Sequence, residues 1–426
     1  MTPFLPVILA LCLAALPEGA VAGPSDIGTP WGDSTAVGAP GAGPSRADTT
    51  IAAAGTDSVA AHPAPRVDYL WVTRSTLVDR AGVERLVTRA HAAGVRGLLV
   101  QVVGRGDAFY RSDVLPRSEA LDRSDYDPLA LVLERAHAAG LEVHAWMNCV
   151  LVWSAPHRPR DPNHVLNRHP EWVAHLPDGR SMTRLSAGER RRLGVEGVYL
   201  SPARPAVRAW IASIAREIAT RYAVDGIHLD YIREPGAFAG LDGNARATFA
   251  LEQGADPARF GLEPPARRAV LDSSWKAFQR AQVTAIVRGV RDTLERSRPG
   301  LALSAAVLAD TVSAERDHAQ EWRAWVRDGL LDRVFVMCYA PEVQTVLSQM
   351  LAYSSDPGTA RVVPGIAVFN STAAATAAKL RGAIELGYRT LALYSYDVLD
   401  ERVGYWDELA GFLGTPPAAV PSRGSR

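Results

Sequence analysis

The feature that most constrains the fold is an alternation that begins near Val67 and continues through the body of the chain. Short apolar runs end in polar residues, and amphipathic helical stretches follow them. Near-continuous apolar runs are typical of parallel strands buried on both faces. We assign eight such runs: Tyr69–Thr73, Gly97–Val103, Glu142–Asn148, Gly226–Asp230, Ala302–Leu308, Val334–Tyr339, Val362–Val368 and Thr390–Tyr396. Eight β/α units within residues 66–415 predict an α/β fold, a (β/α)8 TIM barrel.

The connections between these runs support the barrel. Helical periodicity covers Arg80–Ala93, Pro205–Tyr222, Ser273–Ser297 and Thr372–Leu386. Turns from helix into strand are short and carry glycine, which is a common residue just after a helix end. The alternative is an open doubly wound sheet, but no GxGxxG or P-loop motif follows the first strand.

The connections that leave strands 2, 3 and 4 are long: residues 104–125, 149–203 and 231–271. Long ordered loops on one face usually build a site. In a TIM barrel that face is the C-terminal one, where active sites lie. We therefore expect the functional residues at the ends of the strands.

The first 65 residues differ from the body of the chain. An apolar segment, Phe4–Leu16, is too short to span a bilayer, and Ala20-Val21-Ala22 fits the cleavage rule of a signal peptide. No Lys or Arg precedes this segment, so an uncleaved anchor or a start codon placed too early is the alternative. We expect a signal peptide at 1–22, a disordered linker at 23–65 that is rich in Gly, Ala, Pro, Ser and Thr, and a disordered tail at 416–426. This arrangement predicts a secreted, periplasmic or envelope protein with no membrane span in the mature chain.

Composition excludes several classes of partner. The formal net charge is zero, which does not favour nucleic acid or a membrane surface. Cys149 and Cys338 are the cysteines left for the mature chain, and two are too few for a disulfide framework. No Cys/His cluster has zinc-ligand spacing, so we predict neither a metal nor a cofactor. The oligomeric state stays open.

Polar and aromatic side chains gather at the predicted strand ends. In chain order the predicted substrate-binding residues are Arg74, Gln101, Arg105, Asp107, His144, Trp146, Asn148, His228, Tyr231, Tyr339 and Tyr396. Aromatic faces stack on sugar C–H surfaces, while amides and carboxylates bond hydroxyl groups. The set lacks the concentrated positive charge of a phosphate-rich ligand site. A polysaccharide is the predicted partner, and a metal shared by His144, His228 and Asp230 is a weaker alternative.

Hydrolysis of a glycosidic bond requires two carboxyl groups across that bond, one of them kept protonated by its surroundings. Asp230 is the first choice, because it ends the apolar run GIHLD. Glu342 and Asp310 are the leading choices for the second group, with Glu234 and Asp397 as further candidates. Asp225 precedes the same run and should lie at the opposite face in a structural role. Asp107 either orders a loop with Arg105 or takes part in the chemistry.

Several long segments resemble the glycosyl-hydrolase-like family 10, a group of bacterial (β/α)8 proteins. They are LWVTRS at 70–75, VQVVGRGDAFYRSDVLPRSE at 100–119, YDPLALVLERAHAAGLEVHAWMN at 126–148, HPEWV at 169–173 and the stretch 199–235 that ends in GIHLDYIREP. The resemblance covers roughly residues 66–410. It implies a secreted or envelope hydrolase that acts on bacterial glycans, such as peptidoglycan strands or another amino-sugar polymer.

The resemblance also implies roles for particular residues: Asp230 from GIHLDY, Arg105 and Asp107 from GDAFY, and Asn148 from HAWMN. Two places depart from the family. Cys149-Val150-Leu151 stands where Pro-Tyr-Arg is common, and 232–234 lacks the aromatic pair that often precedes the proline.

Three hypotheses follow. The first is an extracytoplasmic glycoside hydrolase with acid/base chemistry at the C-terminal face of the barrel. The second is a barrel that binds glycan without cleaving it. The third is a metal-dependent hydrolase acting on sugar substituents, such as a deacetylase.

Overall fold

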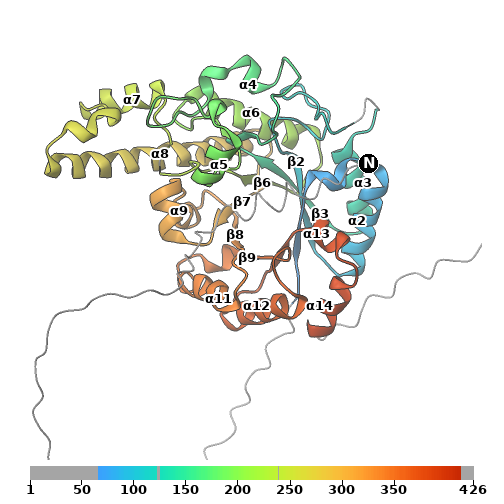
Figure 1. Cartoon of the computed structure of the whole chain (residues 1–426). Helices are drawn as coiled ribbons and strands as arrows, with labels where there is room; N and C mark the ends of the chain where they lie inside the picture. The colour runs from blue at the N-terminus through green and yellow to red at the C-terminus, as the bar shows by residue number, and fades with distance from the viewer. Residues whose placement is uncertain (1–65, 122–124, 238, 414–426) are drawn as a thin grey trace, which may run out of the picture.

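A computed structural model describes residues 66–121, 125–237 and 239–413. The predicted signal peptide, linker and C-terminal tail lie outside these residues. Eight parallel strands form a closed barrel in the order β1-β10-β9-β8-β7-β6-β3-β2 (Figure 1). The strands are β1 (Tyr69–Val72), β2 (Gly97–Val103), β3 (Glu142–Asn148), β6 (Gly226–Asp230), β7 (Ala302–Leu308), β8 (Arg333–Cys338), β9 (Val362–Ala367) and β10 (Ala392–Tyr394). The predicted TIM barrel is therefore confirmed.

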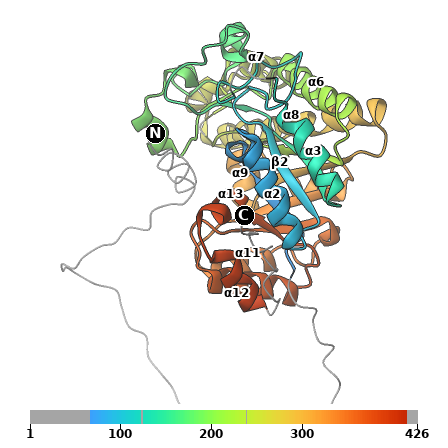
Figure 2. The ribbon, with the colours of Figure 1, turned by 90° about the vertical axis from the view of Figure 1, so that its right-hand side faces the viewer.

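Helices surround this barrel on the outside. They are α2 (Arg80–Ala92), α3 (Pro128–Ala138), α6 (Pro205–Arg221), α8 (Pro265–Ser297), α9 (Thr311–His318), α10 (Trp322–Arg327), α11 (Val343–Leu351), α12 (Ala373–Glu385), α13 (Tyr396–Glu401) and α14 (Tyr405–Leu413). In the view turned by 90°, α2 and α3 lie side by side next to β2 (Figure 2). Helix α3 begins with Pro128 at its first position, and Asp127 caps it by accepting a hydrogen bond from the Ala130 amide.

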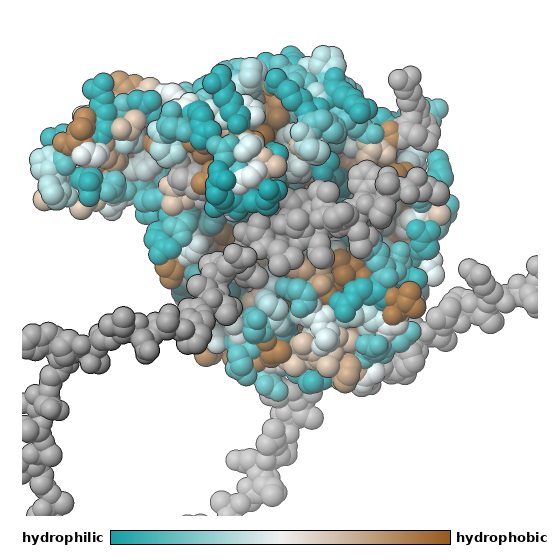
Figure 3. Space-filling view, viewed as in Figure 1, coloured by the Kyte–Doolittle hydropathy of each residue, from teal (hydrophilic) through white to brown (hydrophobic). Residues whose placement is uncertain are grey.

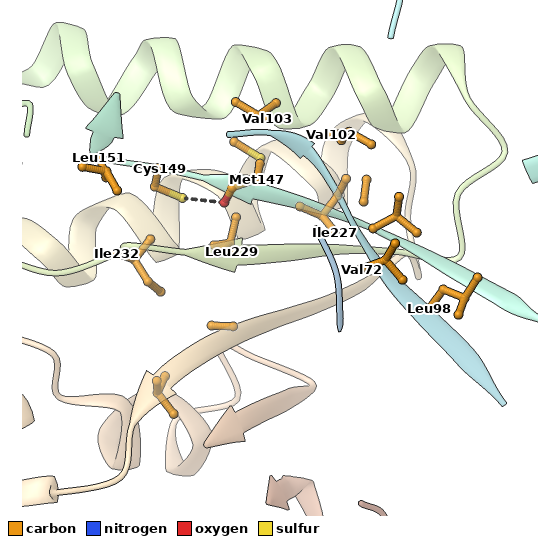
Figure 4. Close-up of a cluster of buried hydrophobic side chains, with 14 of the residues drawn as sticks. Val72, Leu98, Val102, Val103, Met147, Cys149, Leu151, Ile227, Leu229 and Ile232 are labelled. Atoms are coloured by element: carbon orange, nitrogen blue, oxygen red, sulfur yellow. Dashed lines mark hydrogen bonds between the residues drawn. The ribbon is translucent and has the colours of Figure 1, made fainter. Parts of the chain in front are cut away.

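Alternating side chains along the strands build two separate cores. The inner one fills the barrel with Tyr69, Trp71, Leu99, Trp146, Ala306, Phe335, Val363 and Ala392. The outer one lies between strands and helices, and Figure 4 shows part of it, including Val72, Leu98, Ile227 and Leu229. Cys149 belongs to this outer core, where its thiol lies 3.8 Å from the Met147 carbonyl oxygen (Figure 4). Both Cys149 and Cys338 are buried free thiols, as expected.

The long loops carry additional elements. The connection after β3 holds a small antiparallel sheet of β4 (Leu151–Trp153) and β5 (Val198–Tyr199), and the helices α4 (Val165–Arg168) and α5 (Ala187–Leu193). The connection after β6 holds α7 (Gly243–Gln253) and a 3-10 helix, Pro257–Leu262.

Helix α7, the 3-10 helix and the first part of α8 form an arm that extends away from the barrel, at the left of Figure 1. The arm has its own apolar cluster around Phe249, Trp275 and Phe278. Leu251 and Leu262 are 89% and 85% exposed, and hydrophobic residues stand among hydrophilic ones on the arm in Figure 3. Within the part of the chain that the structure describes, no helix has the length and apolarity to cross a membrane.

Candidate active site

Asp230 is the last residue of β6, and its side chain is buried at the end of the barrel interior. Its Oδ2 accepts a hydrogen bond from Trp146 Nε1 at 3.1 Å, and its Oδ1 accepts one from the Tyr231 amide at 2.6 Å. Burial raises the pKa of this carboxyl to about 6, although the Arg233 charge and both hydrogen bonds act in the opposite direction. The group can therefore carry a proton in mildly acidic solution.

The chain turns sharply directly after this carboxylate. Tyr231 has a φ of +51°, in the left-handed region that non-glycine residues rarely adopt. Such a conformation costs on the order of 1 kcal/mol and is common at functional sites. The turn brings the Tyr231 amide onto the Asp230 side chain.

The Tyr231 ring packs within the protein. The Arg233 guanidinium lies over it, 4.6 Å from the ring centroid, and also donates to Glu196 Oε1 at 3.2 Å. Glu196 in turn accepts a hydrogen bond from the Tyr199 hydroxyl at 2.7 Å. Sequence analysis missed Glu196, because the loop that carries it has no periodic pattern. Substrate contact by Tyr231 stays a prediction.

Four aromatic rings lie together, and one of them, Trp146, donates a hydrogen bond to Asp230. Tyr394 is 5.0 Å from Tyr339, 6.0 Å from Trp71 and 6.4 Å from Trp146, measured between ring centroids. Phe369 joins the group at 6.2 Å from Tyr394. Trp146 and Tyr339 are thus placed where the sequence analysis expected them, while Trp71, Phe369 and Tyr394 were left out of the predicted set. We call Trp71, Trp146, Tyr339 and Tyr394 the aromatic floor.

Tyr396 does not belong to this floor. It is buried in the outer core, and its hydroxyl lies 3.3 Å from Asp400 Oδ1. The expectation that Tyr396 faces the barrel mouth is wrong, because β10 ends at Tyr394 and Tyr396 already begins helix α13. The alternation of a strand therefore does not reach it.

An amide network connects the ends of β1, β2 and β3. Arg74 donates to Gln101 Oε1 at 2.9 Å, Gln101 Nε2 donates to Asn148 Oδ1 at 3.3 Å, and Asn148 donates to the Gly104 carbonyl at 2.9 Å. Asn148 also pairs in register with Asp230 on β6. These predicted residues are thus brought together next to the candidate acid.

Arg105 and Asp107 lie in the loop that follows β2. Asp107 Oδ1 accepts a hydrogen bond from the Arg105 amide at 2.9 Å, so this carboxylate orders the loop. The Arg105 side chain donates from Nε to Ser154 Oγ at 2.9 Å. Of the two readings of Asp107, the structure supports the loop-ordering one.

His228 lies inside the barrel, fully buried below the mouth. Trp71 Nε1 donates to its Nε2 at 3.1 Å, and its Nδ1 lies 3.0 Å from Ser304 Oγ. Burial lowers its pKa well below the usual range, so the ring stays neutral. With both nitrogen atoms engaged by core residues, the expected substrate contact of His228 is wrong.

His144 lies nearer the N-terminal ends of the strands. It pairs in register with Gly226, the first residue of β6, and its Nε2 is 3.5 Å from Glu142 Oε2. The expectation that His144 faces the mouth is therefore wrong, since it is only the third residue of β3. Within the described ranges no group of three His, Cys, Asp or Glu side chains could hold a metal, so the shared metal site is not supported.

The candidates for a second carboxylate differ in their surroundings. Asp310 is exposed, and its Oδ1 caps α9 by accepting from the Val312 and Ser313 amides, both at 3.0 Å. Asp397 accepts from the Thr73 amide and from Ser75, which ties α13 to the end of β1. Both carboxylates thus make structural hydrogen bonds. Among the described residues, no hydrogen bond or ion pair joins either of them to Asp230.

Glu342 and Glu234 are different cases. Glu342 is exposed on the rim where α11 begins and makes no side-chain cap. Glu234 is 3% exposed, and burial raises its pKa to about 8, with the Asp242 charge adding to the effect. Asp225, at the opposite face, accepts from the Val143 amide at 2.7 Å and has the structural role expected of it.

Comparison with known proteins decides the family. The model of the family described as glycosyl hydrolase-like 10 matches residues 69–370. The chain belongs to this family. The resemblance inferred from the sequence segments is therefore confirmed.

Curated relatives are named as glycosyl hydrolases. The chain is 28% identical over 269 residues to the glycosyl hydrolase DigH of Escherichia coli K12, covering 57% of this chain and 54% of DigH. It is 24% identical over 222 residues to the glycosyl hydrolase YngK of Bacillus subtilis 168, covering 50% and 37%. The chain thus spans about half the length of the first of these relatives, and less of the second.

Solved structures agree on the fold. The glycoside hydrolase domain of PgaB (BpsB) from Bordetella bronchiseptica matches with a TM-score of 0.63 and 16% identity, over 82% of this chain and 98% of that domain. The α-L-fucosidase isoenzyme 2 of Paenibacillus thiaminolyticus matches with a TM-score of 0.57 and 11% identity, over 82% and 49%. At such identities the likeness concerns the barrel alone.

Proposed function

We propose that this chain is an extracytoplasmic glycoside hydrolase that cleaves a bacterial glycan with Asp230 as its proton donor. The observation that carries the proposal is the environment of Asp230: a buried carboxyl with a pKa of about 6, at the C-terminal end of a barrel strand and beside the aromatic floor. Family membership supports the hydrolase class. Peptidoglycan strands or another amino-sugar polymer are the proposed substrates.

The proposed chemistry begins with a sugar held against Tyr339 and Tyr394, the partly buried rings of the aromatic floor, which Trp71 and Trp146 support from within the core. Aromatic rings offer flat apolar faces that match the C–H faces of a pyranose, while nearby amides take its hydroxyl groups. Protonated Asp230 then gives its proton to the glycosidic oxygen as the bond to the anomeric carbon breaks. The Trp146 and Tyr231 hydrogen bonds stabilise the carboxylate that remains.

A second group must either activate the water that bonds to the anomeric carbon, or attack that carbon first and then be displaced by water. Glu342 stays our first candidate from the sequence, because it is exposed on the rim. Glu196 is an additional candidate, because its charge acts on Asp230 and it is held by Arg233. An N-acetyl group of the substrate could serve instead, in which case one protein carboxyl suffices.

The location in the envelope is proposed from the N-terminal sequence, with its apolar segment, small-residue site and linker-like composition. It is tested by whether a tagged chain is recovered outside the cytoplasm and whether its N-terminus then begins after Ala22.

The test of activity is mass spectrometry of products from peptide-free peptidoglycan strands, β-linked N-acetylglucosamine polymers and neutral polysaccharides. Wild type should release fragments from one class, and Asp230→Asn should lower the rate by at least about 100-fold. If Asp230 is the acid, kcat/KM for wild type should fall above a pH of about 6, where its proton is lost.

Glu342→Gln and Glu196→Gln distinguish the two candidates for the second group, with Asp310→Asn as a matched control on the same face. Retention of glycan by both wild type and Asp230→Asn, without fragments from either, would instead support a barrel that only binds glycan.

A further inference from the structure

Two arginines at the mouth have only neutral hydrogen-bond partners among the residues that the structure describes. Arg74 donates to the amide oxygen of Gln101, and Arg105 donates from Nε to the hydroxyl of Ser154, both at 2.9 Å. Neither forms an ion pair with a carboxylate of residues 66–121, 125–237 or 239–413. By contrast, Arg233 at the same mouth is paired with Glu196.

The two guanidinium groups act on one another. Burial, together with the positive charge of Arg74, lowers the pKa of Arg105 to about 10, while Asp107 and Glu119 act in the opposite direction. Two neighbouring cations that are partly removed from water repel each other. An anion bound between them would offset this repulsion. The protein therefore holds positive charge here without an internal carboxylate bound to it.

The backbone around the pair is shaped to hold both side chains. A Cβ on Gly104 would lie 2.7 Å from both Cδ and a terminal nitrogen of Arg74, so only glycine lets that side chain lie across the backbone. The Arg105 carbonyl accepts a hydrogen bond from His164 Nε2 at 2.7 Å, and its amide donates to Asp107. Both guanidinium groups are thus placed by several elements.

The pair is close to the candidate acid in the barrel. Arg74 follows β1 and Arg105 follows β2, and the ring continues through β3 to β6, which carries Asp230. Two strand spacings separate β2 from β6, or about 10 Å. A charged substituent held by the pair would therefore lie on a sugar near the bond that Asp230 acts on.

We propose that Arg74 and Arg105 form a subsite for a carboxylate of the glycan, so that the substrate is an acidic polysaccharide. The inference rests on the proposed function, since it names the substrate class of the same site. A planar carboxylate matches the fork of a guanidinium group. Two arginines amid neutral amides suit one such group better than a chain of phosphates. The carboxylate could belong to the sugar ring, as in a uronic acid, or to an ether side chain, as in peptide-free muramic acid.

The test uses wild type and chemically matched substrates. Peptide-free peptidoglycan strands and polyuronate oligosaccharides are each compared with the same material after reduction of its carboxyl groups to alcohols. We expect kcat/KM on the acidic form of one polymer to exceed that on its reduced form by at least about tenfold. The polymer that shows this preference identifies the source of the carboxylate.

Variants then assign the preference to the pair. In Arg105→Gln and Arg74→Gln the acidic-to-reduced ratio should fall to within about threefold. The matched control is Arg208→Gln, because Arg208 is also partly buried and donates to a glutamine, Gln282, and to a carbonyl, but lies on α6 outside the mouth. This control should keep the wild-type ratio.

Failure of the inference differs from failure of the proposed function. Equal cleavage of acidic and reduced strands would overturn the subsite and leave the hydrolase intact. If wild type cleaves nothing, calorimetric titration of the Asp230→Asn protein with the same pairs of glycans decides. Tighter binding of the acidic form that is lost on adding Arg105→Gln supports the subsite, and equal binding of both forms overturns it.

Discussion

At the scale of single residues, Asp230 is held in a state that costs stability. Ionising a buried carboxyl costs free energy, because the charged form loses its contact with water, and this cost raises the pKa of Asp230. The hydrogen bonds from Trp146 and Tyr231 offset part of this penalty and fix the direction of the carboxyl group. A proton donor requires such a position, whereas a purely structural aspartate would be more stable when paired or exposed.

This environment predicts the pH dependence of stability. The folded pKa of about 6 lies above the unfolded value of about 3.9, so the folded state binds more protons between these values. The contribution of Asp230 to stability should therefore fall as pH rises from about 4 to about 6, and stay lower above that. Asp230→Asn does not titrate, so its stability relative to wild type should rise by about 2 kcal/mol across this window.

Urea unfolding of both proteins at pH 4 and pH 7 measures the effect. Asp310→Asn is the matched control, because asparagine caps a helix as well as aspartate does and the site is exposed. A difference between Asp230→Asn and wild type that is the same at both pH values would contradict the buried-acid description.

Sequence could predict Asp230, Asn148 and Gln101, because each falls at the C-terminal end of a β-rich run. It could not place His144, since strand position alone does not say how far a residue lies from the barrel mouth. Tyr396 was chosen in place of Tyr394 for a related reason: the last strand ends two residues before the predicted end. Glu196 depends on a tertiary ion pair with Arg233 that no local pattern reveals.

At the scale of elements, the strands were predictable to within one residue at most ends. Runs buried on both faces are bounded by glycine and polar residues, and β2, β3, β6 and β7 coincide with the predicted ranges. Helix α8 begins at Pro265, eight residues before the predicted start at Ser273. Its first turns are exposed and lack an apolar face, and the Pro264-Pro265 pair reads as a loop although proline is well tolerated at a helix start.

Strand β9 shows how an element shapes the aromatic floor. A Cβ on Gly365 would lie 2.4 Å from two ring atoms of Trp71. Gly365→Ala should therefore displace the indole and cost about 1–3 kcal/mol, the usual range for overpacking a core. Thermal and urea unfolding measure the loss, and the product assay should show a raised KM because the floor has moved.

The control for this change is Gly289→Ala within α8, where an added Cβ meets no atom within 4 Å. There alanine should stabilise by up to about 1 kcal/mol through helix propensity. Combining Gly365→Ala with Trp71→Phe should recover part of the stability. Equal stability of Gly365→Ala and wild type would show that the contact with Trp71 is not tight.

At the scale of the whole molecule, the barrel and the arm have separate apolar clusters. The barrel depends on the inner and outer cores, whereas the arm depends on a small group around Phe249 that contacts Phe260 at 5.9 Å, Phe278 at 5.6 Å and Trp275 at 5.2 Å. The sequence predicted a long connection here but not its helices, since α7 carries little apolar periodicity. Separate clusters allow one part to open while the other stays folded.

Phe249→Ala should therefore loosen the arm without unfolding the barrel. Truncating a fully buried phenylalanine to alanine costs about 3–5 kcal/mol of folding free energy. In a cluster this small, that loss should be enough to unfold the arm locally. Amide exchange and protease cleavage within 243–262 should accelerate, while exchange of the barrel strands stays as in wild type.

Leu251→Ala on the same helix is the control, because that side chain is 89% exposed and should change nothing. Leu229→Ala in β6 should instead lower the midpoint of global unfolding. If Phe249→Ala lowered that midpoint equally, the arm and the barrel would be one cooperative unit.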